Sequence, residues 1–494
     1  MISQSGKPGE SRLEALLDRS IRAGLVLIVV LAPLPFGAVE PWATSALELG
    51  VAAVALLFLY RLFLFPATTR IEFSPLLVPA VGILVLMGMQ IIPLPERVIG
   101  ALSPKTSELY RDALPRGSAP ADDVSTAAAP TPGKAPDPWR PISQSSFATR
   151  TYLLKGVAFT LFLFLFLNAF HETRQVRLVL YALVAAGTFQ AFYGVLEYVS
   201  GHQHIFLYQK KYYTDAATGT FINRNHYAAF LEMALLSALG LFLSRLREPH
   251  AGETWRERLL ALTDRRASLN LALLLGIGII AVGLVLSYSR AGIILGMVAA
   301  AAFCLFQLRR GWSLQKTVLV GVLSAAVLVP AYGVGYWTLT GRYSLLTTEL
   351  TMPGGRMAVW KKTLGIVRDF PLTGTGVGTF QFVFPRYRDA TTTAFYDYAH
   401  NDYLQVLSEA GLMGGILLAL AVAVIGAAWI RRAAPMGSVL RSACGFGLLA
   451  VALHEMVDFS LQIPANLLAF TLLAGSLLVL GKTGGEPEEG VPRA

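Results

Sequence analysis

Long apolar stretches alternate with short polar ones along nearly the whole chain. Many of the apolar stretches reach about 18 residues or more, the length that an α-helix needs to cross a hydrocarbon core of roughly 30 Å. The pattern predicts membrane-spanning helices at residues 23–39, 43–65, 75–94, 152–170, 176–199, 226–244, 269–288, 291–308, 316–337, 403–430, 438–456 and 464–481. We therefore expect an all-α, polytopic transmembrane helical bundle of about 12 helices.

Composition supports a membrane protein over a set of soluble domains. The 494 residues are 54% hydrophobic and only 15% charged, whereas a soluble protein carries about 25% charged residues. We expect a cytoplasmic N-terminal segment at 1–22, one transmembrane domain at 23–481 and a cytoplasmic tail at 482–494. The first apolar stretch follows several arginines and could pass for a signal peptide, but the many later spans favour an uncleaved first helix.

Charge gives the orientation of the bundle. The formal net charge is +10, which in a soluble protein would suggest a nucleic-acid partner. Here the positive residues lie in every second loop, so membrane topology explains much of the excess, and we expect no nucleic acid to bind. These loops contain Arg12, Arg19, Arg22, Arg61, Arg70, Arg174, Arg177, Arg245, Arg247, Arg256, Arg258, Arg265, Arg266, Arg309, Arg310, Lys316, Arg431, Arg432 and Arg441. By the positive-inside rule, their side of the membrane is the cytoplasm.

The opposite side receives the remaining connections. Residues 95–150 form a Pro/Ala/Ser/Thr-rich insert whose composition predicts a largely flexible loop. Residues 338–402 form a second long loop, for which we expect short helices. Shorter connections lie at 200–225, at 287–290 and near 454–466. Most of the polar residues that suggest chemistry lie on this side.

Two arginines stand at the boundary of predicted spans. Arg224 lies in the run Asn223-Arg224-Asn225-His226, and Arg290 lies in the very short turn between two apolar spans. A guanidinium group offers five donors in a planar fork that suits phosphate, and an arginine at membrane depth is costly unless it is paired or meets water. Helix capping and interfacial anchoring explain the first run equally well, and snorkelling toward lipid headgroups explains the second.

The long loop adds glycine-rich segments and a histidine. Arg356 follows Gly354-Gly355, and a further run reads Gly374-Thr375-Gly376-Val377-Gly378. No strand–turn–helix unit surrounds these glycines, so they do not form a dinucleotide-binding fingerprint. The loop then ends in His400-Asn401-Asp402-Tyr403. Imidazole titrates near neutral pH, so His400 is a candidate general base that Asp402 or Glu409 would orient; a structural role is the alternative.

Further polar residues lie at the outer end of the penultimate span. His454, Asp458 and Gln462 are spaced four apart, which predicts a shared helix face or its extension. Such a stripe either holds helices together or lines a substrate groove. Both cysteines, Cys304 and Cys444, fall inside apolar spans, so we expect neither a disulfide framework nor a metal cluster.

The ordered set of motifs resembles the O-antigen ligase and polymerase superfamily. The resemblance covers about residues 150–480 and rests on Asn223-Arg224-Asn225-His226, Ser287-Tyr288-Ser289-Arg290-Ala291-Gly292, Gly355-Arg356 through Trp360, and His400-Asn401-Asp402-Tyr403-Leu404-Gln405. It implies a twelve-helix glycosyltransferase of the bacterial inner membrane with its active face toward the periplasm. The implied donor is a glycan on undecaprenyl diphosphate, and the implied acceptor is lipid A–core, another glycan chain or a protein. Envelope polysaccharide assembly proteins are implied partners.

The resemblance also assigns residue roles. Arg224 and Arg290 match arginines thought to hold the diphosphate, Arg356 matches a loop arginine, and His400 matches the histidine proposed to activate the acceptor hydroxyl. We expect support from Asn223, Asn225, His226, Asn401, Asp402, His454 and Asp458. Neither a metal nor another cofactor is expected.

These assignments predict metal-independent, inverting glycosyl transfer. Negative charge that builds on the leaving diphosphate would be stabilised by the arginines, and no carboxylate pair like that of a glycosidase is evident. A transporter or flippase of lipid-linked glycans is the main alternative, because intramembrane polar residues often mark transport paths. Carriers, however, usually place their site near the bilayer midplane. A structural scaffold in an envelope assembly is a third class.

Overall fold

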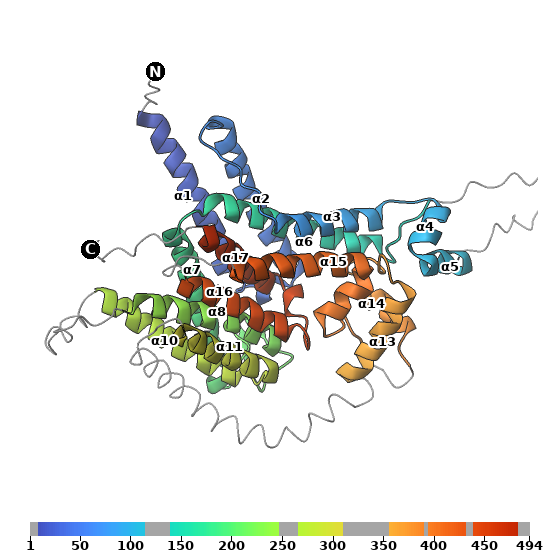
Figure 1. The fold of residues 1–494 in the computed structure, drawn as a ribbon. Helices are drawn as coiled ribbons and strands as arrows, with labels where there is room; N and C mark the ends of the chain where they lie inside the picture. The colour runs from blue at the N-terminus through green and yellow to red at the C-terminus, as the bar shows by residue number, and fades with distance from the viewer. Residues whose placement is uncertain are drawn as a thin grey trace, which may run out of the picture. The chain divides into compact units, whose positions relative to one another are not determined.

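The computed structural model describes residues 8–113, 139–246, 265–309, 355–389, 394–430 and 438–482. Helices dominate these residues, with one two-stranded hairpin (Figure 1). The longer helices are α1 (Pro8–Leu31), α2 (Pro41–Leu64), α3 (Leu77–Ile91), α6 (Ser146–Ala169), α7 (Thr173–Ser200), α8 (Arg224–Arg245), α10 (Arg265–Leu286), α11 (Arg290–Leu308), α13 (Arg356–Asp369), α15 (Asp402–Ile430), α16 (Ser438–His454) and α17 (Pro464–Lys482). The shorter elements are η1 (Phe36–Ala38), α4 (Glu96–Leu102), α5 (Pro104–Ala113), β1 (His204–Ile205), β2 (Tyr208–Gln209), α14 (Phe380–Val383), η2 (Phe384–Arg386) and η3 (Ser460–Gln462).

Within the described residues, eight helices are long and apolar enough to cross a membrane. They are α2, α6, α7, α8, α10, α11, α15 and α17, and α3 and α16 are shorter apolar helices. This confirms an all-α, polytopic membrane protein. The predicted span at 316–337 lies outside the described residues.

Two sequence predictions need correction. The first predicted span, 23–39, is wrong at its end, because α1 stops at Leu31 before a turn that contains Pro33 and Pro35. The insert at 95–150, predicted to be largely flexible, begins with α4 and α5, and α6 already starts at Ser146. The Pro/Ala/Ser/Thr-rich composition that suggested flexibility lies mainly between these helices, at 114–138, outside the described residues. The long loop at 338–402 carries the short helices expected there, α13 and α14.

The chain divides into two compact units, each of which is described by itself. Unit 1 comprises Met1–Leu77, Ala158–Leu346 and Val422–Ala494, and unit 2 comprises Val78–Val157 and Thr347–Ala421. Arg224, Arg290, His454 and Asp458 fall in unit 1, whereas Arg356, His400 and Asp402 fall in unit 2.

Helix α8 is the centre of unit 1. It is buried almost all round and packs against α7, α10, α11, α16 and α17 (Figure 1). Small residues allow the close approach, because a methyl group on Gly187 would lie 2.3 Å from the Cβ of Ala234, and one on Gly240 would lie 2.4 Å from the Cβ of Ala443. Lipid tails are as apolar as the helices, so association in a membrane depends on such packing.

In unit 2 the glycine-rich run is fixed by a break in α15. Gly411 adopts φ +61° within that helix, and the freed backbone pairs with the run: Gly376 N donates to Glu409 O at 2.9 Å and Leu412 N donates to Pro371 O at 2.8 Å. Gln90, fully buried, donates to the carbonyl oxygens of Thr373 and Glu409 and accepts from the amide of Val377. The glycines therefore fold the loop rather than cradle a ligand.

Replacing Gly374 by alanine should destabilise unit 2. Gly374 has φ +68°, and a methyl group there would lie 2.2 Å from the carbonyl carbon of Glu409. The left-handed backbone alone costs an L-residue about 1–2 kcal/mol, and the clash adds to it. We expect a lower thermal midpoint for the purified protein in detergent. Gly88→Ala is the control, because nothing lies within 4 Å of the added methyl group; equal midpoints for the two variants would contradict the prediction.

Candidate functional site

The N-terminus of α8 is held in a polar network. Asn223 caps the helix, since its side-chain oxygen accepts from the amide of Asn225 at 2.8 Å. The side chain of Asn225 in turn donates to Asp458. His226 Nε2 lies 3.7 Å from Asp458 Oδ1, and its carbonyl accepts from the side chain of Asn466 at 2.9 Å. Thus the structure brings together Asn223, Asn225, His226 and Asp458, four residues that the sequence singled out.

Arg224 is the first residue of α8 and is half-buried. Its guanidinium carbon lies 5.4 Å from the centre of the Tyr213 ring, a cation–π arrangement that orients the side chain. The connection that precedes it is anchored at two points: Thr220 Oγ1 donates to Pro33 O at 2.5 Å, and Ala217 N donates to Leu286 O at 2.8 Å. These bonds fix the direction from which Arg224 enters the helix.

Arg290 occupies the same position in α11. It is that helix's first residue, and the N-cap Ser289 accepts from the amide of Gly292 at 3.3 Å. The turn before it is narrow, because Tyr288 has φ +52° and its hydroxyl bonds to the hydroxyl of Tyr198 at 2.8 Å. Arg290 is half-buried and thus held close to the end of the helix.

Helices α8 and α11 run side by side and in parallel. A methyl group on Gly292 would lie 2.5 Å from the Cβ of Ala228, and one on Gly296 would lie 3.2 Å from Cγ of Glu232. In both contacts the residue of α11 is 64 positions after its neighbour in α8. The same offset places Arg290 beside His226, close to the start of α8. Two helix N-termini, each of which begins with an arginine, therefore lie side by side in unit 1. Both features attract anions.

His454 forms a buried pair with Glu232. Its Nδ1 lies 2.7 Å from Glu232 Oε1, and both side chains are fully buried. The pair joins α16 to α8 two turns inside the bundle from Arg224, which suits helix association better than a groove at the surface. Of the two alternatives predicted for His454, Asp458 and Gln462, a shared helix face is wrong, because α16 ends at His454; Asp458 and Gln462 lie beyond the helix, with Gln462 in η3.

Removing one member of this pair should destabilise the protein strongly. Glu232→Ala leaves the imidazole of His454 buried without this partner, a change that costs about 3 kcal/mol in buried pairs. The double variant Glu232→Leu/His454→Leu should recover much of the loss, since no polar group is then stranded. Thermal midpoints in detergent measure both. The single variants Glu232→Leu and His454→Leu complete the comparison. If the double variant lowers the midpoint by the sum of the two single decreases, the result would contradict a direct interaction.

Unit 2 contains the second group of predicted residues. His400 has φ +52° and precedes α15, whose first turn is capped by Asn401, because that side chain accepts from the amide of Leu404 at 3.0 Å. Trp360 Nε1 donates to the carbonyl of His400 at 3.2 Å. Arg356, the first residue of α13, lies one helical turn before Trp360. The indole therefore ties the arginine-bearing end of α13 to the histidine segment.

The neighbouring groups narrow the choice of base. Glu409, considered in the sequence as a partner that orients His400, accepts from the amide of Phe380 at 2.8 Å and so holds the glycine-rich run. Burial raises the pKa of Tyr398 to about 12, so this phenol, which hydrogen-bonds the hydroxyl of Tyr152 at 2.9 Å, stays protonated at neutral pH. Asp402 is buried at the start of α15. His400, half-buried, remains the candidate base in this unit.

Several contributing residues were not singled out in the sequence. Glu232 lies inside a predicted span, and a carboxylate within a membrane span indicates a buried partner or a functional position, so the sequence did contain a signal for it. Tyr213 and Gln90 gave no comparable signal, because aromatic and amide side chains are ordinary in loops and helices. The role of Gln90 depends on contacts at least 283 positions away in the chain, and that of Tyr213 on its ring lying under Arg224.

Comparison with known proteins relates one segment of the chain to a known family. Residues 275–419 match the family model described as O-antigen ligase. The matched segment includes Arg290, Arg356 and His400, whereas Arg224 lies before it. Among curated proteins, none matches the chain. The match over this segment confirms the resemblance to the O-antigen ligase superfamily, and the eight long apolar helices among the described residues support a multi-pass membrane protein.

Proposed function

We propose that this protein transfers a glycan from undecaprenyl diphosphate to an acceptor hydroxyl at the periplasmic face of a bacterial inner membrane. The acceptor is lipid A–core, another glycan chain or a protein. The paired starts of α8 and α11 carry the proposal. Each of these helices begins with an arginine, and the contacts of Gly292 and Gly296 make the two ends neighbours.

A lipid diphosphate matches the charge at these two helix ends. A cation at a helix N-terminus has the unfavourable sign relative to the helix dipole, whereas an anion there is favoured. A diphosphate bound between Arg224 and Arg290 would accept bidentate hydrogen bonds from both guanidinium groups. The network of Asn225, His226 and Asp458 would keep the α8 end in place while charge builds up on the leaving group.

The proposed reaction inverts the anomeric carbon in one displacement. The acceptor oxygen forms a bond to that carbon while the bond from carbon to the diphosphate oxygen breaks, and the electron pair leaves with the diphosphate. The acceptor proton passes to His400. The chemistry uses no metal. It requires His400 and the two arginines to meet around one lipid headgroup, and this meeting stays a prediction, as does a contribution from Arg356.

A reconstituted transfer assay tests the proposal. Purified protein in detergent, supplied with a lipid-linked glycan and a separate acceptor, should form a new glycosidic bond and release undecaprenyl diphosphate, also after treatment with EDTA. A transporter or flippase would only move the lipid-linked glycan between compartments and would form no glycosidic bond in detergent. A scaffold would form none either. Gene deletion then distinguishes acceptors: loss of capped lipid A–core indicates a ligase, and accumulation of single repeat units indicates a polymerase. Absence of bond formation with every acceptor would overturn the proposal.

A further inference from the structure

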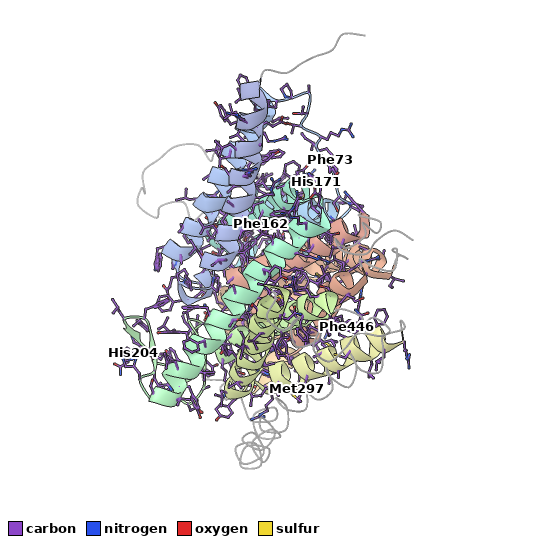
Figure 2. All side chains as sticks on the ribbon, turned by 90° about the vertical axis from the view of Figure 1, so that its left-hand side faces the viewer. Phe73, Phe162, His171, His204, Met297 and Phe446 are labelled. Atoms are coloured by element: carbon purple, nitrogen blue, oxygen red, sulfur yellow. The ribbon has the colours of Figure 1, made fainter. Side chains whose placement is uncertain are left out.

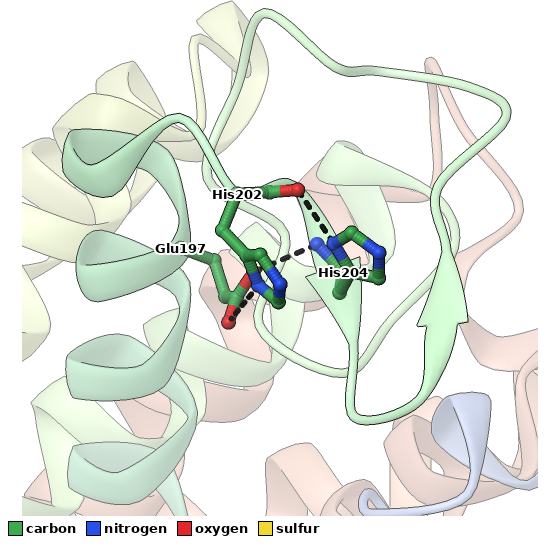
Figure 3. Close-up of side chains that lie close together, drawn as sticks. All are labelled: Glu197, His202 and His204. Atoms are coloured by element: carbon green, nitrogen blue, oxygen red, sulfur yellow. Dashed lines mark hydrogen bonds and ion pairs between the residues drawn. The ribbon is translucent and has the colours of Figure 1, made fainter.

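Three potential metal ligands gather where α7 ends. Glu197 lies in the last turn of α7, His202 follows in the connection to the hairpin, and His204 begins strand β1 (Figure 3). One ligand atom of each residue lies within 4.8 Å of those of the other two. Glu197 Oε2 lies 2.9 Å from His202 Nδ1 and accepts from the backbone amide of His204 at 2.7 Å. The two imidazole rings stack with centroids 3.8 Å apart.

The backbone of this cluster is fixed by its surroundings. Gly201 ends α7 in the left-handed conformation, and Gln203, between the histidines, has φ +55°. The buried Lys210 fixes Gln203 by two hydrogen bonds. The backbone amide of Lys210 donates to the Gln203 carbonyl at 3.0 Å, and Lys210 Nζ donates to Gln203 Oε1 at 2.8 Å. The hydroxyl of Tyr193 donates to the His204 carbonyl at 3.3 Å. Both imidazoles are thereby presented on the same side as Glu197.

The hydrogen bonds also set which nitrogen can bind a metal. His204 Nδ1 lies 2.6 Å from the carbonyl oxygen of His202. A carbonyl oxygen only accepts, so Nδ1 carries the proton and Nε2 keeps its lone pair. A histidine that donates its other N–H to a backbone carbonyl is the usual arrangement of a metal ligand. Glu197, whose side chain is 13% exposed, supplies an oriented carboxylate.

We propose that Glu197, His202 and His204 bind a divalent transition-metal ion, with zinc as the best fit. Two imidazoles and one carboxylate form a donor set that suits zinc, whereas Mg²⁺ and Ca²⁺ prefer oxygen ligands. Tetrahedral Zn–N bonds of about 2.0 Å place ligand atoms about 3.3 Å apart. Without metal, His202 Nδ1 donates to Glu197, so metal binding would release this proton, and the exposed side chain of His202 can rotate to close the present spacing. Water would fill the fourth position.

The ion would brace the connection that leads to Arg224. It would tie the end of α7 to the strand β1, and Lys210 extends the same frame because its Nζ also donates to the Ala216 carbonyl at 3.0 Å. The next residue, Ala217, is anchored to Leu286. The ion would lie apart from the chemistry of glycosyl transfer, so the inference does not depend on the proposed function.

Metal binding to the full-length protein tests this inference without an activity assay. The protein is purified with a tag that contains no histidine, stripped with EDTA and titrated with zinc by calorimetry. One zinc per chain should bind, and His204→Ala, His202→Ala and Glu197→Gln should each weaken binding at least 10-fold, since even the partners of ligands contribute 10–100-fold. His171→Ala is the matched control: His171 stands at the opposite end of α7 (Figure 2) and is exposed there.

Cobalt provides a second measurement that reports coordination directly. Co²⁺ bound by three protein ligands and water should give visible d–d absorption, and this absorption should disappear in His204→Ala but not in His171→Ala. A variant that fails to fold is recognised by its elution from a size-exclusion column. If His204→Ala fails in this way, His202→Ala is used instead, because His202 is exposed in the present structure. No binding to the parent protein, or equal affinity and spectra in parent and ligand variants, would overturn the inference.

Discussion

Replacing Arg290 by alanine should lower the rate of glycan transfer about 100-fold, as expected when one preorganised hydrogen-bond donor to developing negative charge is removed. Arg224→Ala should have a similar effect. Both arginines are the first residues of neighbouring helices, and both are half-buried. Charge on the departing diphosphate is larger in the transition state than in the bound donor. The loss should therefore fall mainly on kcat rather than on KM.

The shape of the guanidinium group matters as well as its charge. Arg290→Lys keeps a cation but loses the planar fork that bonds two phosphate oxygens at once. Its rate should lie between those of the parent and Arg290→Ala. If Arg290 only anchored α11 at the membrane surface by snorkelling, lysine would restore the parent rate in full.

A matched arginine provides the control. Arg174 lies in the first turn of α7, as Arg290 lies in the first turn of α11, but it is exposed, and the start of α7 carries none of the motifs. Arg174→Ala should leave transfer unchanged. Full activity of both Arg224→Ala and Arg290→Ala, measured with purified protein and lipid-linked glycan, would remove the basis for diphosphate binding at these helix ends.

The positions of most helices could be predicted from the sequence because the length of an apolar stretch is a local property. The span predicted at 176–199 is α7, and that predicted at 226–244 is α8. The prediction failed where a few residues decide the outcome, as at Pro33 and Pro35 after α1. It also failed in 96–113, where the average composition of a long insert concealed the short helices α4 and α5.

The contacts within the candidate site could not be predicted, because they join residues far apart in the chain. Glu232 and His454 are 222 positions apart, and neither sequence context indicates the other. The alignment of α8 with α11 depends on whether Gly292 and Gly296 face Ala228 and Glu232. A glycine in an apolar run can face lipid or a helix equally well. The sequence could name arginines suited to phosphate, but only the packing makes two of them neighbours.

The removal of the His400 imidazole should lower the transfer rate by about 100-fold or more, the usual contribution of a positioned general base. The choice of substitution matters, because His400 has φ +52°. Alanine in that conformation is strained by about 1–2 kcal/mol, whereas asparagine adopts it readily. His400→Asn therefore removes the base while it preserves the backbone, including the carbonyl that accepts from Trp360.

The acceptor itself can show whether His400 acts as a base. If the imidazole removes the acceptor proton, an acceptor whose hydroxyl is more acidic needs less help, so His400→Asn should lose less activity with it than with an ordinary sugar hydroxyl. A residue that only shapes the loop would lose the same factor with both acceptors. His171→Asn, in an exposed position before α7, serves as the control and should transfer at the parent rate with either acceptor. Equal losses for both acceptors in His400→Asn, or full activity, would assign His400 a structural role beside Trp360.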